Sequence, residues 1–192
     1  SNFQTTELGL RYEELRAGSG PPPQRGQSVL LQYTLSIGGF PGEDEWVKID
    51  GSKGFMKPPG GYGCYAGVGD RGIMGAPIVG LDLMLMDMQA GSARRVVIPP
   101  SLAFGERGIG GITGSKIPPN SPLYMEIELL ELGDEPVMDP AQEEFLRVNP
   151  LPVDRRVVPA QAAAVEAPAP VAAAPEAASA PVSSEGAEAE PL

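Results

Sequence analysis

The chain offers few of the side chains that enzymes use for conventional chemistry. It has no His among 192 residues and a single thiol, Cys64. The absence of His removes His-based acid and base catalysis, catalytic triads that contain His, and most transition-metal sites. A lone Cys cannot form an intrachain disulfide, so a small, half-buried thiol is our interpretation of Cys64.

Two other groups of residues have a spacing or a composition that could indicate a ligand-binding site. Gly67, Gly69 and Gly72 in GVGDRG have the spacing of a dinucleotide-binding fingerprint, but that fingerprint needs a strand before it and a helix opening directly from it. Neither is convincing here, so we interpret these glycines as turn formers. The acidic run Glu43–Glu45 lies in a Gly/Pro-rich loop without the spacing of a calcium loop, which favours a solvated surface.

Charge and hydrophobicity exclude several classes of function. The net charge of −11 argues against binding to nucleic acid or to anionic membranes, because both call for clustered Lys and Arg. No apolar run approaches the roughly 18 to 20 residues that a membrane-spanning helix needs. We therefore expect no membrane span, and the sequence predicts neither a cofactor nor a metal.

Five segments have the periodicity of regular structure. Apolar and polar residues alternate, fully or in part, in three predicted strands, Ser28–Ile37, Ser92–Pro99 and Pro122–Leu132. Leu8–Leu15 is typical of an edge strand. Ile78–Met88 is apolar nearly all round and rich in Leu and Met, which predicts one short helix packed against a sheet.

The segments between these elements are rich in Gly and Pro. Gly38–Gly75 is interrupted so often that it should be mostly loop with short extended pieces. Residues 101–121 form a long Gly-rich connection, of the kind that usually carries function in a compact domain.

The composition changes after Gly133. Asp139 and Pro140 suit the start of a short helix over residues 141–148. From Pro150 the chain is Ala, Pro, Val and Glu without aromatic residues, which predicts a disordered, extended tail. We accordingly predict a domain over residues 8–133, a linker with a short helix over 134–149, and a tail over 150–192.

The most informative string is RVVIPPSLAFGERGIG…KIPPNSPLYMEIELLEL. It resembles the C-terminal half of the FKBP-type peptidyl-prolyl isomerases, the macrolide-binding immunophilins. Upstream, GQSVLLQYTLSI and PIVGLDLMLMDMQAGSARRVVIP resemble two further stretches of the family. Order and spacing agree from about Leu10 to Leu132.

The resemblance implies an α+β fold, in which a twisted antiparallel sheet of about five strands wraps around one short helix with an apolar pocket between them. It also implies isomerisation of Xaa-Pro bonds in protein substrates. That reaction crosses a barrier of about 18 to 20 kcal/mol that arises from amide resonance, and no bond is made or broken. An apolar pocket with a few fixed donors suits it, since such surroundings disfavour the planar, charge-separated amide.

Carried over position by position, the resemblance implies eight site residues. The backbone N–H of Ile78 would receive a substrate carbonyl, and Ile49 with Asp50 matches the family's Phe-Asp pair only loosely. The implied catalytic residues are Tyr33, Asp50, Ile78, Leu81 and Phe104, and the implied substrate-binding residues are Ile49, Ile117 and Met125.

Three departures from the family pattern weaken the expected activity. Leu81 replaces the Trp of the pocket floor, Phe104 replaces a Tyr whose hydroxyl bonds substrate, and Met125 replaces a Phe wall. The site stays apolar but loses a large flat surface and one donor. We therefore expect weak isomerase activity or, as the alternative, a non-catalytic FKBP-fold module that joins a larger protein complex.

Partners and location follow from the same resemblance. A proline-containing protein is the expected substrate, and residues 38–75 or the tail 150–192 are candidate surfaces for a multi-subunit complex. The longer 38–75 segment is also placed to reshape or cover the pocket. The opening NFQTTELGLRYEELRAGSG resembles the start of mature plastid FKBP domains, some of which act in the thylakoid lumen, so we expect a chloroplast protein.

Overall fold

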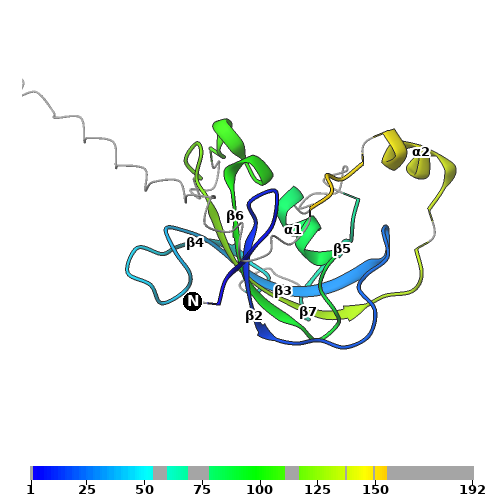
Figure 1. Cartoon of the computed structure of the whole chain (residues 1–192), viewed down its shortest axis with the longest axis horizontal. Coiled ribbons are helices and arrows are strands. Elements are labelled where there is room, and N and C mark those ends of the chain that lie inside the picture. The colour runs from blue at the N-terminus through cyan, green and yellow to red at the C-terminus, as the bar shows by residue number, and fades with distance from the viewer. Residues whose placement is uncertain are drawn as a thin grey trace, which may run out of the picture.

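A sheet curved around one short helix dominates the structure, a computed structural model that describes residues 2–53, 60–68, 78–110, 117–136, 138–148 and 150–154 (Figure 1). All the strand pairings are antiparallel, which confirms the predicted α+β fold. The strands are β1 (Gln4–Thr5), β2 (Arg11–Arg16), β3 (Ser28–Ile37), β4 (Val47–Gly51), β5 (Tyr62–Tyr65), β6 (Ala93–Ile98) and β7 (Leu123–Leu132). The helices are α1 (Val79–Leu85), α2 (Pro140–Val148) and two short 3₁₀ turns, η1 (Pro100–Leu102) and η2 (Gly105–Arg107).

Within the described residues the sheet has seven strands, in the order β1-β2-β6-β7-β3-β4, with β5 paired to β3. The first half of β3 pairs with β5 and its second half with β4. These two short strands are the extended pieces expected within residues 38–75. The parts of that segment at 54–59 and 69–77, and the predicted tail from 155 onward, lie outside the described residues.

The two faces of the sheet differ as the alternating sequence requires. On β7, Leu123, Met125, Ile127 and Leu129 are almost completely buried beneath α1. The intervening acidic residues point to the outer face, where Glu126 forms an ion pair with Arg95 and Glu128 one with Arg16. The acidic residues of this strand are thus paired across the sheet as well as solvated.

A glycine lets helix α1 lie very close to the sheet. A Cβ placed on Gly80 would stand 2.3 Å from Cγ2 of Ile98 on β6 and 3.2 Å from the carbonyl oxygen of Leu102 in η1. Real carbon atoms do not approach so closely. The absence of a side chain at Gly80 therefore fixes the distance between α1, β6 and the turn that follows β6.

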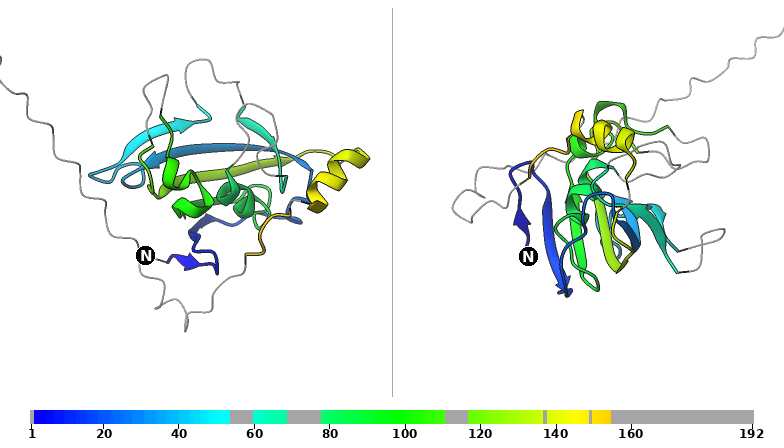
Figure 2. Two further views of the ribbon diagram at one scale, coloured as in Figure 1. Left: turned by 90° about the horizontal axis from the view of Figure 1, so that it is seen from above. Right: turned by 90° about the vertical axis from the view of Figure 1, so that its right-hand side faces the viewer.

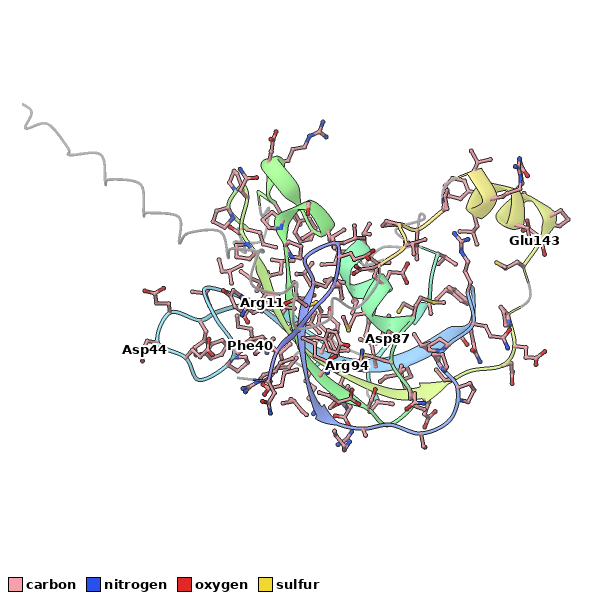
Figure 3. All side chains as sticks on the ribbon, in the orientation of Figure 1. Arg11, Phe40, Asp44, Asp87, Arg94 and Glu143 are labelled. Atoms are coloured by element: carbon pink, nitrogen blue, oxygen red, sulfur yellow. The ribbon has the colours of Figure 1, made fainter. Side chains whose placement is uncertain are left out.

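The connection between β3 and β4 is anchored on the outer face. Phe40 is 4% exposed; its ring stacks on Phe3 at 5.9 Å, meets Tyr124 edge-on at 5.2 Å and lies beneath the guanidinium of Arg95 at 5.3 Å. Figure 3 shows Phe40 next to the sheet and Asp44 at the outer end of this connection. Residues 38–46 thus cover the face of the sheet that points away from α1.

Arg94 is a buried cation on the inner face. Its guanidinium lies 4.7 Å from the ring centroid of Tyr12 and forms ion pairs with Asp87 at 2.9 Å and Glu14 at 3.3 Å (Figure 3). Because a buried charge is costly unless it is paired, these contacts hold Arg94 in place under the end of α1.

Candidate functional site

The predicted site residues come from separate segments and meet in one region. Seven of the eight are apolar or aromatic and belong to, or pack against, the single core cluster between α1 and the sheet. Three of them are nearly inaccessible: Leu81 at 4%, Ile117 at 4% and Met125 at 2% exposure. The half-buried members are Tyr33, Ile49, Ile78 and Phe104. Asp50 is also half-buried and contacts Tyr33.

Tyr33 and Asp50 are joined directly. The hydroxyl of Tyr33 on β3 donates a hydrogen bond of 2.7 Å to Oδ2 of Asp50 on β4. Burial and the acceptor carboxylate both raise the pKa of the Tyr33 phenol, with burial the larger cause. The phenol therefore stays protonated at neutral pH and holds the carboxylate in one orientation.

A hydroxyl side chain holds this part of the sheet in register. The amide N–H of Tyr33 donates to the hydroxyl of Ser52 at 2.9 Å, and the amide of Ser52 donates to the carbonyl of Tyr33 at 3.0 Å. The strand pairing is irregular between Leu35 and Ser36, which leaves Ile49 as the additional residue of β4. The β4 segment that carries Ile49 and Asp50 is thus fixed to β3 on both sides of this bulge.

Helix α1 presents Ile78 and Leu81 to the same region. Ile78 is the N-cap, with an extended backbone, and its carbonyl accepts the N–H of Asp82 at 3.0 Å. The N–H of Ile78 has no acceptor among the described residues. This is the amide that the resemblance assigns to a substrate carbonyl, and an unpaired N–H is what such a role requires.

The connection after β6 supplies Phe104 and Ile117. Phe104 precedes η2, and its carbonyl accepts the N–H of Gly108 at 3.2 Å. Ile117 forms a two-way backbone bridge with Ile109, at 2.8 and 3.0 Å, so the ends of the loop they enclose are held together. The Gly-rich connection singled out in the sequence thus carries two candidate site residues, although its residues 111–116 lie outside the described part of the chain.

Tyr62 is a neighbour of the site that sequence reasoning missed. It lies on β5 opposite Leu31, and its ring meets that of Tyr33 edge-on with centroids 5.6 Å apart. Because Leu31 is buried on the inner face, Tyr62 brings a second phenol to that face. The alternation in YGCY indicates a strand that places Tyr62 and Cys64 on one face, but the surrounding Gly and Pro residues favoured a loop.

Cys64, two residues further along β5, lies on the same face and is half-buried. Burial, and secondarily the negative charge of Asp82, raises the pKa of its thiol to about 12. The thiol is therefore protonated at neutral pH and a poor nucleophile. The described residues contain no group of three His, Cys, Asp or Glu side chains able to hold a metal ion.

The geometry thus suits binding rather than bond-making chemistry. The region combines aromatic and branched side chains, one oriented carboxylate and one unpaired backbone donor. Such a surface can bind a proline side chain and a carbonyl oxygen, and it can favour the twisted amide over the planar one.

Comparison with known proteins decides the family. The sequence profile described as FKBP-type peptidyl-prolyl cis-trans isomerase matches residues 67–130. The FK506-binding protein 1 of Gibberella zeae is 32% identical over 130 residues, which cover 66% of this chain and 100% of that protein. The chain belongs to the FKBP family.

Other members extend the comparison to plants. This FKBP chain is 31% identical over 144 residues to the chloroplastic peptidyl-prolyl cis-trans isomerase FKBP16-4 of Arabidopsis thaliana, a match that covers 74% of the chain and 56% of that protein. The crystal structure of AtFKBP13 superposes with a TM-score of 0.55 at 28% identity, covering 69% of this chain and all of the other. The chain spans about half the length of the chloroplastic relatives it matches.

Within the described residues, no helix has the length and apolar character needed to cross a membrane.

Proposed function

We propose that the chain is a peptidyl-prolyl cis-trans isomerase of reduced activity that acts on Xaa-Pro bonds of protein substrates. One observation carries the proposal: side chains from β3, β4, α1, β7 and the connection after β6 converge between the helix and the sheet. In this proposal Tyr33, Ile49, Ile78 and Phe104 contact the substrate, and Asp50 is the oriented charge beside them.

The buried members have a different role in the proposal. Leu81, Ile117 and Met125 form the buried layer that supports the half-buried contact residues. Leu81 and Met125 are smaller or narrower than the Trp and Phe that the family pattern places there, so they offer a bound proline less flat surface. The Tyr33 hydroxyl is engaged with Asp50 and Phe104 has no hydroxyl, so neither ring supplies a donor. Reduced binding of the twisted amide, and hence a lower rate, follows from both effects.

The proposal is tested by measuring isomerisation of a short Xaa-Pro peptide series by exchange spectroscopy. Phe104→Tyr should raise kcat/KM by about two- to tenfold, because one added hydrogen bond is worth about 0.5–1.5 kcal/mol. Phe145→Tyr on α2 adds the same hydroxyl at an exposed position and is the matched control. Leu81→Trp combined with Phe104→Tyr restores the family pattern at both positions.

Turnover by the native chain above the uncatalysed rate would establish an isomerase. If neither the native chain nor the double variant accelerates exchange, the proposal is wrong.

A second candidate function is a non-catalytic module of a protein complex. The near-complete burial of Leu81 and Met125 favours this function. These residues stand where the family pattern has Trp and Phe, and neither presents an exposed ring in their place. Activity confined to the double variant, together with a stoichiometric partner that survives purification of the native chain, would select this function.

We also infer a plastid location, which the chloroplastic relatives support. Fractionation of the source cells with detection of this chain tests it. Recovery outside the plastid fraction would contradict the inference.

A further inference from the structure

Arg25 connects helix α2 to the segment that leads toward α1. Its Nη2 donates to the carbonyl oxygen of Leu146 in α2 at 3.2 Å, and its Nε donates to the carbonyl oxygen of Gly67 at 2.9 Å. A planar guanidinium directs these two donors at a fixed angle to each other. Arg25 therefore links Gly67 to α2, next to the backbone hydrogen bonds that join Ala66 to Gly26 and Gln27.

Gly67 in turn is bonded to α1. Its amide N–H donates to Oδ1 of Asp82 at 2.5 Å, and Asp82 is fully buried in the first turn of the helix. Gly67 has a φ of +73°, and a Cβ placed on it would stand 2.8 Å from Sδ of Met86 and 3.0 Å from Cγ of Arg25. This residue is thus enclosed between α1 and Arg25, so a shift of Arg25 must be transmitted to the helix.

The α2 end of this connection is itself held against the domain. Leu146 is 6% exposed, although both of its neighbours on α2 are exposed. Gly26 leaves room for Met138, whose sulfur would be 2.9 Å from a Cβ at that position. Beyond the helix, Oδ1 of Asp154 accepts the amide N–H of Leu8 at 2.9 Å. Figures 1 and 2 place α2 at the end of the sheet where β3 begins and β7 ends.

We propose that Arg25 is a positioning residue for the isomerase site and that docking of α2 acts on the site through it. Asp82 follows Leu81 directly and its backbone N–H donates to the carbonyl oxygen of Ile78, so the position of Asp82 is coupled to those of both candidate site residues. The inference rests on the proposed function for its effect on catalysis, and on geometry alone for its effect on α1.

The first test compares Arg25→Ala and Arg25→Lys in the full chain. Both variants should lower kcat/KM about fivefold, within the range of about two- to thirtyfold that such coupling produces. Lys keeps the charge but cannot reproduce the two-donor geometry, so Arg25→Lys should not restore kcat/KM.

Arg16 provides the matched control. Its Nε donates to the carbonyl of Gly91 at 2.7 Å and its Nη2 bonds Glu128, so it also makes two long-range bonds, but none to α1 or to residues 66–68. Arg16→Ala should leave kcat/KM unchanged. An equal loss in both alanine variants, or full rescue by Arg25→Lys, would overturn the proposal.

A double-mutant cycle tests the link to α2. Leu146→Ala removes the buried anchor of the helix without adding charge. If α2 acts through Arg25, the double variant should be no slower than Arg25→Ala alone, because the second change removes a connection that is already lost. If the loss in kcat/KM of the double variant is the product of the losses of the two single variants, α2 does not act through Arg25.

A spectroscopic measurement separates this inference from the proposed function. Amide resonances of Ile78 and Leu81 should shift in Arg25→Ala and Leu146→Ala but not in Arg16→Ala, whether or not the native chain is an isomerase. Unchanged α1 resonances in Arg25→Ala would refute the positioning role. If these resonances shift but the protein shows no turnover, the positioning role stands and only the proposed activity is wrong.

Discussion

Replacing Gly80 by Ala sets two physical effects against each other. Ala is a better helix former than Gly by about 1 kcal/mol, so an isolated helix would gain from the change. In the folded chain, however, the new methyl group would stand 2.3 Å from Cγ2 of Ile98. Carbon atoms normally approach to about 3.5–4.0 Å, so the two must separate by more than about 1 Å.

The surroundings leave little space for that movement. Ile98 is completely buried, and the carbonyl oxygen of Leu102 lies 3.2 Å from the same methyl position on another side. Overpacking of a dense core costs about 1–3 kcal/mol. After the helix-propensity gain is subtracted, we expect Gly80→Ala to lower the free energy of unfolding by up to about 2 kcal/mol. Displacement of α1 from β6 should also reduce kcat/KM.

Urea denaturation followed by Trp46 fluorescence and circular dichroism measures the change. Gly63→Ala is the control, because the nearest heavy atom to a Cβ at that position in β5 is 4.0 Å away. It should be neutral or slightly stabilising, since Ala costs less chain entropy than Gly. If Gly80→Ala is as stable as the native chain, the close packing of α1 on β6 does not limit this domain and our reasoning fails.

Three further predictions concern single side chains. Tyr33→Phe removes the hydrogen bond to the Asp50 carboxylate and should lower the free energy of unfolding by about 1 kcal/mol. This is less than the usual value for a hydrogen bond to a charged acceptor, because the pair is only half-buried. Denaturation in urea would measure the change. The thiol of Cys64 has a pKa near 9 in the unfolded chain and of about 12 in the folded chain. The unfolded chain therefore releases this proton at lower pH than the folded chain does. The free energy of unfolding should fall as pH rises through this interval, by up to about 1.4 kcal/mol per pH unit. Cys64→Ala should make the profile less steep over that interval, in which the raised pKa of the Tyr33 phenol also contributes a slope, and an unchanged profile would contradict the assignment. Asp139→Ala removes the carboxylate that accepts the Ala141 N–H at 2.8 Å and should destabilise α2 locally by about 1 kcal/mol, measured by amide exchange within the helix.

The sequence was most informative where one physical rule governs a whole element. The predicted strand Ser28–Ile37 coincides with β3, because β-branched, aromatic and apolar residues recur along it without any Gly or Pro. The start of α2 at Pro140, capped by Asp139, also followed from local preferences alone. In both cases the residues that decide the structure are adjacent in the chain.

Contacts between distant segments were not predictable in this way. The anchoring of Phe40 on the outer face depends on Phe3, Arg95 and Tyr124, which come from three other parts of the chain. The placement of Tyr62 beside Tyr33 needed the register of β5 against β3. A single sequence carries no signal for such pairings. The resemblance to a family supplied the candidate site, and its catalytic roles stay predictions.

The strand order also has a consequence for how the chain folds. Strand β7, the last strand among the described residues, lies in the interior of the sheet between β6 and β3, and β3 precedes it by about 90 residues along the chain. Pairings of such long sequence separation form slowly, because loop closure must precede any gain from the contacts. During synthesis the earlier strands lack their central neighbour until β7 has left the ribosome. We therefore expect the domain to fold in one late, cooperative step, with unpaired strand edges exposed until then.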